Sequence, residues 1–295
     1  MLFNSEVWHG IEDNDLKVLE SIDENLLRYL VKAHSKTPLE FLYLETGAIP
    51  IRFLISSRRL IYLRTILMKD DSELVKRIFK AQLENPSPGD YIELLKNDFQ
   101  KINEFYDEQE VVNKCSQTYK KSIKMKIRKA ALKYLNDLKN THTKIKNINY
   151  ETLKCQDYLK SSMFSNTDVN TLFSLRSRMI ECKVNFKSKH QNNNLKCKFC
   201  KTDEDDSQEH LLECIELARR HKGKSMTKEK VEYQDIFKDV IKQKQITQIY
   251  TELLEIRKKL EEDDQHRELD PSTVQTVLRN SFDLHNSIDN YSFGK

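Results

Sequence analysis

Residues 37–68, TPLEFLYLETGAIPIRFLISSRRLIYLRTILM, hold one short and one long apolar segment separated by a glycine and a proline. Thr37 and Glu40, on either side of a proline, match the N-cap and N3 positions of a capping box, which predicts the start of a helix. Gly47 predicts the end of this short helix, and Pro50 predicts the start of the next. The second helix is apolar around much of its circumference, so we expect it at the centre of the fold.

The composition of the whole chain also favours helices. The 295 residues include five glycines and five prolines, whereas this pair averages roughly 12% of a protein. A sheet protein with many tight turns needs more of both. Apolar residues make up only 38% of the chain, which predicts a thin core. We therefore predict an all-α fold, an elongated multi-helix assembly with a disordered C-terminal tail from about residue 263.

Helical spacing of apolar residues predicts further helices along the rest of the chain. We expect them at about 13–30, on either side of the turn at 85–90, over 107–139, from Asp168 onward, and as two helices broken near 242–245. The opening MLFNSEVW alternates loosely and is interpreted as one strand.

Basic residues are concentrated in the segment 114–146. The chain has a net charge of only +4, but this segment holds eleven Lys or Arg residues and a single acid, Asp137. Such a local excess attracts polyanions, although a solvated helix face is the alternative interpretation. The residues that we expect to contact RNA or an RNA–DNA duplex are Lys120, Lys121, Lys124, Lys126, Arg128, Lys129, Arg176 and Arg178.

The sequence also predicts where the protein is found. The opening residues lack the basic start and apolar core of a secretory signal, and no apolar run approaches the ~18 residues of a membrane span. We therefore expect an intracellular protein, nuclear or cytoplasmic, with no membrane partner. Its six cysteines then lie in a reducing compartment, where spaced Cys and His indicate metal more often than disulfide.

Residues 197–214, CKFCKTDEDDSQEHLLEC, have the spacing C-x2-C-x9-H-x3-C. Two cysteines separated by two residues can hold one tetrahedral ion from a tight turn. Asp206 and Glu209 match a capping box that starts a helix at about Ser207. On that helix the histidine and the last cysteine are four residues apart and share one face. We therefore predict a zinc knuckle in which Zn²⁺ is bound by Cys197, Cys200, His210 and Cys214.

Two other interpretations of these cysteines stay open. Cys197 and Cys200 can be ordinary buried thiols beside a surface histidine, although the H-x3-C spacing favours metal. Redox catalysis by the pair is typical of a strand-to-helix junction, which is not predicted here. The other cysteines, Cys115, Cys155 and Cys182, have no partner at ligand spacing, so we expect them in the core.

The loop between the ligands is acidic, with Asp203, Glu204, Asp205, Asp206 and Glu209. This negative charge repels phosphate. The knuckle is therefore expected to hold flanking helices together and not to grip nucleic acid itself.

Four stretches together resemble the C-terminal portion of non-LTR retrotransposon reverse transcriptases. They are NSEVWHGI at 4–11, LLRYLVKAHSKTPLEFLYLETGAIPIRFLISSRRLIYLRTIL at 26–67, LFSLRSRMIECKVNF at 172–186 and the cysteine-rich stretch at 197–214. The resemblance covers about residues 1–262, and the segments occur in the same order. Members of that family often have a shorter loop before the histidine, or one more residue before the last cysteine.

The resemblance implies an organisation in segments. It implies a thumb-like helical bundle at 1–105, a long basic helical connector at 106–146, a helical region with the Cys-Cys-His-Cys knuckle at 147–262, and a tail at 263–295. It also implies an upstream palm domain as a partner, if the chain is part of a longer polyprotein.

Polymerase chemistry in that family needs paired carboxylates on an aromatic-x-Asp-Asp turn of the palm, where they bind two metal ions. The acidic pairs here, at 70–71, 205–206 and 263–264, lie in polar stretches and are interpreted as caps or solvated charge. We therefore expect a fragment that follows the palm, has no catalytic residues and is not an enzyme on its own. Its expected function is to bind RNA or DNA through the basic helical face. The alternative is a zinc-stabilised helical protein-interaction module with no nucleic-acid role.

Overall fold

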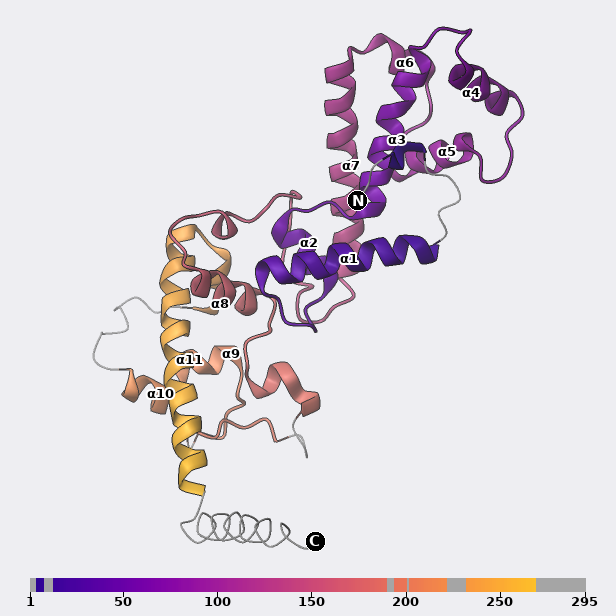
Figure 1. Cartoon of the computed structure of the whole chain (residues 1–295). Helices are drawn as coiled ribbons and strands as arrows, with labels where there is room; N and C mark the ends of the chain where they lie inside the picture. The colour runs from indigo at the N-terminus through magenta and orange to yellow at the C-terminus, as the bar shows by residue number, and fades with distance from the viewer. Residues whose placement is uncertain (1–3, 8–12, 190–193, 201, 222–231, 269–295) are drawn as a thin grey trace, which may run out of the picture. The chain divides into compact units, whose positions relative to one another are not determined.

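The structure is a computed structural model, and Figure 1 draws its described part in colour. The described residues are 4–7, 13–189, 194–200, 202–221 and 232–268. Within these ranges every regular element is a helix, and two residues, Lys196 and Asp205, pair as an isolated β-bridge. The all-α prediction is therefore confirmed. None of the described helices has the length and apolar character that crossing a membrane requires.

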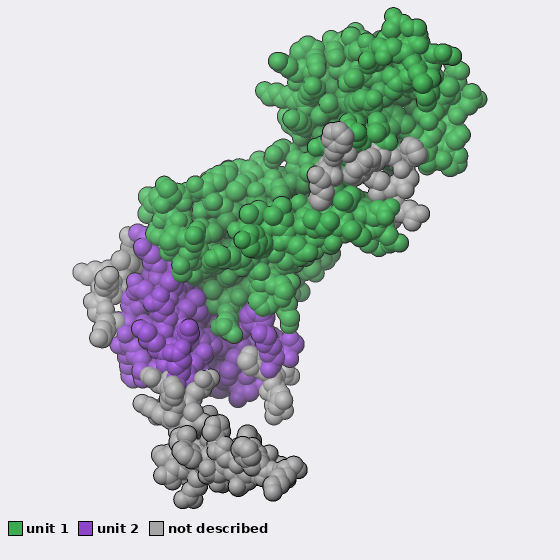
Figure 2. Space-filling model, in the orientation of Figure 1, with its two compact units in different colours: residues 1–181, 234–244 green, residues 182–233, 245–295 purple. Residues whose placement is uncertain are grey.

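The chain divides into two compact units, which have different colours in Figure 2. Unit 1 comprises residues 1–181 and 234–244, and unit 2 comprises residues 182–233 and 245–295. The boundaries expected near residues 105 and 146 both fall inside unit 1. Unit 1 is thus discontinuous in sequence, because the chain leaves it after residue 181 and returns to it at residue 234.

Unit 1 is built around helix α3. Its helices are α1 (Asp13–Val31), α2 (Leu39–Thr46), α3 (Ile51–Leu67), α4 (Leu74–Glu84), α5 (Tyr91–Lys101), α6 (Glu108–Asn113), α7 (Ser116–Lys139) and α8 (Asn166–Arg176). Helix α3 contacts α1, α4, α5, α6 and α7, and it buries Phe53, Leu60 and Leu63. Its apolar circumference therefore places it at the centre of this unit, as expected.

Glycine is required at the end of α2. Gly47 adopts the left-handed conformation with φ 67°, and its amide donates to the Tyr43 carbonyl. A Cβ at this position would lie 2.2 Å from the backbone nitrogen of Cys155. No side chain fits so close to another segment of backbone. The predicted helix end at Gly47 is confirmed.

Two predicted helix starts and one predicted strand are wrong. The capping box at Thr37 does not form, because Pro38 is the N-cap of α2 and no side chain accepts a hydrogen bond there. Helix α8 begins earlier than expected, since Ser165 is its N-cap and Asp168 completes the capping box from position N3. The described part of the opening segment, Ser5–Val7, is a 3-10 turn and not a strand.

A buried ion pair joins distant segments of unit 1. Arg176 Nη2 donates to Glu45 Oε1 at 2.8 Å, and both side chains are almost fully buried. The tyrosine hydroxyls of Tyr150 and Tyr158 donate to the same carboxylate. Arg176 Nη1 donates to the Ile236 carbonyl at 2.9 Å. The carboxylate and the guanidinium thus neutralise each other and find hydrogen-bond partners inside the unit, as a buried pair requires.

The described part of unit 2 contains three helices and a 3-10 segment at Lys183–Lys189. The helices are α9 (Gln208–Glu213), α10 (Ile215–Arg220) and α11 (Val240–Glu268), whose residues from 245 onward belong to this unit. Helix α11 buries Ile246, Tyr250 and Leu253. It runs without a break through residues 242–245, which corrects the prediction of two helices there.

Helix α11 also changes the expected start of the tail. It continues to Glu268, so residues 263–268 are helical and not part of a disordered tail. The rest of the predicted disordered tail, residues 269–295, lies outside the described residues.

Candidate metal centre

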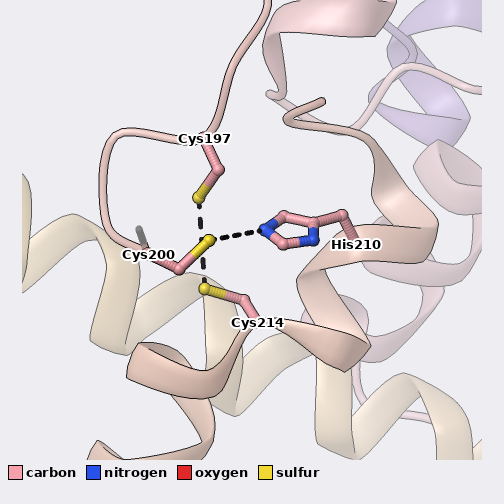
Figure 3. A group of neighbouring side chains, drawn as sticks. All are labelled: Cys197, Cys200, His210 and Cys214. Carbon is pink, nitrogen blue, oxygen red and sulfur yellow. Dashed lines mark hydrogen bonds between the residues drawn. The ribbon is translucent and has the colours of Figure 1, made fainter. Parts of the chain in front are cut away.

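Four side chains of unit 2 point toward one another in Figure 3: Cys197, Cys200, His210 and Cys214. Each offers one ligand atom, and these atoms all lie within 4.8 Å of one another. No other group of three or more His, Cys, Asp or Glu side chains in the described part of the chain is so arranged. The structure therefore brings together all four residues that the spacing predicts.

The distances between the ligand atoms fit one tetrahedral ion. Cys197 Sγ lies 4.0 Å from Cys214 Sγ, and Cys200 Sγ lies 3.3 Å from His210 Nε2. Zinc bonds of ~2.3 Å to sulfur and ~2.0 Å to nitrogen place tetrahedral ligand atoms about 3.5–3.8 Å apart. The two sulfurs are also far from the ~2.05 Å separation of a disulfide. The donor set therefore fits a metal ion.

The first two ligands lie on a loop that backbone hydrogen bonds close. The Cys197 amide donates to the Glu204 carbonyl at 2.9 Å, and the Asp206 amide donates to the Leu195 carbonyl at 2.7 Å. Lys196 Nζ donates to the Asp203 carbonyl at 2.7 Å and pairs with nearby carboxylates. This lysine offsets part of the acidic charge of the loop and helps to hold the turn in shape.

The other two ligands lie on α9 and at its end. Ser207 is the N-cap of α9 and accepts from the His210 amide at 3.0 Å. Cys214 ends α9 and precedes α10, with φ −63° and ψ 110°. The predicted capping box of Asp206 and Glu209 is therefore replaced by Ser207. The histidine and the last cysteine do not lie on one continuous helix, although they still converge.

A carboxylate supports the histidine ligand from behind. Glu204 Oε2 lies 2.9 Å from His210 Nδ1, while His210 Nε2 faces Cys200 Sγ. A carboxylate on the second ring nitrogen fixes the tautomer and the orientation of a metal-binding imidazole. This role of Glu204 is not among those predicted from the sequence. Its only signal was an acid six residues before the histidine, in a loop with several other acids.

Two of the ligand thiols have shifted pKa values. Burial opposes ionisation of Cys200, but hydrogen bonds from Thr202 outweigh it and lower the pKa of the Cys200 thiol to about 7. Burial, together with the charge of Cys197 and Cys200 nearby, raises the pKa of the Cys214 thiol to about 11. Three thiolates so close together repel one another, and a bound cation removes that repulsion.

A buried ion pair attaches the loop to α11. Arg257 donates to both carboxylate oxygens of Asp206, at 2.8 and 2.9 Å. The same carboxylate accepts from the Lys183 amide at 2.9 Å. Tyr250 donates its hydroxyl to the Gln208 carbonyl at 2.7 Å, at the start of α9. The ligand-bearing segments are thus fixed to the longest helix of the unit.

The remaining cysteines lie apart from the centre, and only one is fully buried. Cys182 is buried, as expected, and this burial raises the pKa of its thiol to about 11. Cys155 is partly exposed. Cys115 is exposed at the start of α7, which corrects the prediction that it lies in the core.

The predicted basic face lies on α7 in unit 1. Lys120, Lys121, Lys124 and Lys129 are exposed, and so is Lys133, two turns before the end of the helix. None of these five forms an ion pair with a described acidic residue. Their positive charge is therefore available to a ligand.

The other two predicted α7 residues have intramolecular contacts. Lys126 is partly buried and pairs with Glu104 at 2.9 Å. Arg128 is exposed, but its Nη1 donates to the Leu153 carbonyl at 2.8 Å. Both residues thus help to position the helix within unit 1, and they are less available to a ligand than the five lysines.

Arg176 does not belong to a binding surface. It is 4% exposed and its charge is neutralised by Glu45, which corrects the prediction that it contacts nucleic acid. Arg178 is partly buried and has a positive φ of 55° just after α8. Burial therefore separates Arg176 from the exposed lysines of α7.

The described acidic pairs have structural partners. Asp71 pairs with Lys76 at 2.8 Å. Hydrogen bonds from Lys76 and Lys80 lower the pKa of this exposed carboxyl to about 2. Asp206 is occupied by Arg257, and Asp205 pairs with Lys196 at 3.2 Å. The pair at 263–264 lies on α11. Exposed Asp71 agrees with the interpretation as solvated charge, whereas Asp206 is buried against Arg257 and corrects that interpretation.

Comparison with known proteins gives no relative. No protein-family model, no curated protein and no solved structure matches the chain.

Proposed function

We propose that Zn²⁺ occupies the centre formed by Cys197, Cys200, His210 and Cys214 and acts as a structural staple. The observation that carries this proposal is the convergence of four ligand atoms within 4.8 Å, with Glu204 behind the histidine. Thiolate and imidazole ligands suit zinc and do not suit Mg²⁺ or Ca²⁺. Four protein ligands complete the tetrahedron, so no position is left for a substrate. The metal then contributes to folding and not to catalysis.

We propose further that the exposed lysines of α7 bind RNA or an RNA–DNA duplex. Lys120 and Lys133 are 13 residues apart, so the row extends over about 20 Å of helix at ~1.5 Å per residue. This length spans several successive phosphates. Lysines contact phosphates more than base edges, so we expect binding that is electrostatic and largely independent of sequence.

The sequence resemblance to the C-terminal part of non-LTR reverse transcriptases supports this proposal independently. A thumb and connector that follow a palm hold template and product without carrying the catalytic carboxylates. We accordingly propose that this chain is a non-catalytic fragment of that type. Purified chain should extend no primer on an RNA template with Mg²⁺ or Mn²⁺, and template-dependent incorporation would overturn this part of the proposal.

Salt-dependent binding tests the α7 surface. We expect the full chain to bind RNA at low salt, with log Kd changing by about 0.7–0.9 per phosphate contact for each tenfold change in salt. The triple variant Lys121→Glu, Lys124→Glu, Lys129→Glu should bind more weakly. The slope of its log Kd against log salt concentration should be smaller by about 2–3. The variant Lys17→Glu, Lys36→Glu, Lys96→Glu changes the net charge equally at exposed sites outside α7.

The control variant shows whether binding depends on the α7 surface or only on the net charge of the chain. Equal losses in the two triple variants would show that only net charge matters. No detectable binding at low salt would remove the nucleic-acid role and leave the zinc-stabilised interaction module. Native mass spectrometry tests the metal separately, because a folded chain without one bound zinc ion would contradict the staple.

A further inference from the structure

Helix α1 turns two of its acidic residues, Glu20 and Asp23, toward α2 and α3. Arg52 of α3 donates to the Glu20 carboxylate at 2.5 and 2.7 Å. Tyr43 of α2 donates its hydroxyl to Asp23 at 2.7 Å, and the carboxylate, after burial, raises the pKa of that tyrosine. These contacts fix which side of α1 faces the rest of unit 1. The opposite side of the helix must therefore face outward.

The outward side of α1 is apolar. Its large side chains are exposed: Val18 60%, Ile22 48%, Leu26 54%, Tyr29 80% and Leu30 64%. On the inward side of the same helix, Leu27 is buried in unit 1. A surface helix normally places its large apolar residues inward, whereas α1 buries Leu27 and Val31 and leaves these five exposed. A contiguous exposed apolar patch of this kind marks an interaction site.

The charges around this stripe indicate which partner fits. Asn14, Ser21 and Asn25 line one edge and carry no charge. An anionic membrane or a nucleic acid would need Lys or Arg along the stripe. Asp15 stands near its N-terminal end and Lys32 just beyond its C-terminal end, and both are exposed without an ion pair to a described residue. The two ends of the stripe thus have opposite charge.

We propose that this stripe binds the same stripe of a second copy of the chain, with the two α1 helices antiparallel. Val18, Ile22, Leu26 and Leu30 form an i, i+4 ridge of the kind that packs against another helix. A two-fold axis near the middle of the ridge sets Ile22 against the partner's Leu26 and Val18 against the partner's Leu30. It also brings Asp15 toward the partner's Lys32. A parallel pair would instead bring like charges together.

Sedimentation of the full, zinc-loaded chain under reducing conditions tests the dimer. The mass should rise with concentration from 35.0 kDa toward twice that value. The variant Ile22→Glu, Leu26→Glu should stay monomeric, because it sets glutamates against glutamates across the axis. Leu74→Glu, Ile78→Glu, which alters two exposed apolar residues of α4, should still dimerise. A monomer over the whole concentration range in the unaltered chain overturns the proposal.

A mixing experiment tests both the second copy and the register. The variant Ile22→Lys, Leu26→Lys should also be monomeric alone, but an equimolar mixture with the double glutamate variant should form a mixed dimer. Each lysine then faces a glutamate of the other chain. Circular dichroism confirms that both variants are folded. Failure of two folded variants to pair, or dimers of either variant alone, would contradict the antiparallel stripe.

Discussion

Unit 1 and unit 2 each hold a polar cluster, and these two clusters differ in what completes them. In unit 1 the Glu45 carboxylate receives the Arg176 guanidinium and two tyrosine hydroxyls, so charge and hydrogen bonds are complete within the protein. In unit 2 the corresponding cluster consists of three thiols and an imidazole, which offer lone pairs and no positive charge. The first cluster is complete without a ligand, whereas the second becomes complete when a cation binds.

The difference follows from the size of the two cores. Unit 1 surrounds α3 with helices and buries many large apolar side chains. In the described part of unit 2, α9 and α10 have six residues each, and much of the apolar burial comes from α11. Small cores seldom supply enough stability by themselves and often depend on a metal or a disulfide. Under the proposed function, the metal and the ion pair have comparable structural roles in cores of different size.

Removal of the metal should have the largest effect and should act on unit 2. Structural zinc contributes about 10–16 kcal/mol of apparent binding free energy in small zinc domains. After chelation we expect loss of amide protection at 194–221, while α3 keeps its protection. Hydrogen exchange with mass spectrometry measures both units in one sample. Cys200→Ser with Cys214→Ser should reproduce the effect, and Cys115→Ser, at an exposed thiol, should not.

Removal of one partner of the ion pair should act on unit 1. Glu45→Gln leaves the buried charge of Arg176 without a counter-charge, which costs about 3–5 kcal/mol. Denaturant unfolding gives the loss, and native mass spectrometry should still find one zinc ion per chain. The double variant Glu45→Gln, Arg176→Met should lose less than the sum of the single variants. Strict additivity would show that the two residues do not act as a pair.

Two costs of substituting Gly47, the steric contact with Cys155 and the left-handed backbone, can be measured separately by comparison with a second glycine. Gly47 and Gly89 both have positive φ, but nothing lies within 4 Å of a Cβ at Gly89. Gly89→Ala should therefore cost only the left-handed penalty of about 1–2 kcal/mol. Gly47→Ala should cost about 1–3 kcal/mol more, because it also forces backbone apart. Thermal unfolding of the two variants would refute this explanation if the losses were equal.

The contact behind the histidine should have the smallest effect. Glu204→Gln keeps the four ligands but weakens the hold on His210 Nδ1, so we expect metal affinity to fall about 10–100-fold. Competition with a chromophoric chelator measures this change. Asp203→Asn removes a carboxylate of the same loop that is 91% exposed, and it should leave the affinity unchanged. An equal loss of metal affinity in both variants would show that the effect comes from the charge of the loop and not from the contact with His210.

Local chemistry explains what the sequence predicted correctly. Gly47 ends α2 as predicted, because a glycine in the left-handed conformation acts on backbone groups within a few residues. The four metal ligands lie within one short stretch, so their spacing was sufficient to predict that they converge. The apolar circumference of α3 likewise indicated its central place without knowledge of its neighbours.

Contacts distant in sequence explain what could not be predicted. Arg176 looked like a surface cation because its counter-charge, Glu45, lies 131 residues away. The outward stripe of α1 has the same helical spacing as a buried stripe, and only the contacts of Glu20 and Asp23 reveal its direction. Glu204 could not be distinguished from the neighbouring acids until the fold placed it beside His210.

Because unit 1 is discontinuous in sequence, the ribosome finishes the metal-ligand cluster before it finishes the segments that contact Arg176. All four metal ligands have been translated once Cys214 is added, but Ile236, whose carbonyl accepts from Arg176, follows 22 residues later. At roughly 5–20 residues per second, this delay is about 1–4 s. The nascent chain can therefore capture its ion while the segment at 234–244 is still to be made. Under the proposed function, the supply of Zn²⁺ during translation then influences whether the ligand-bearing loop is ordered before unit 1 receives its last contacts.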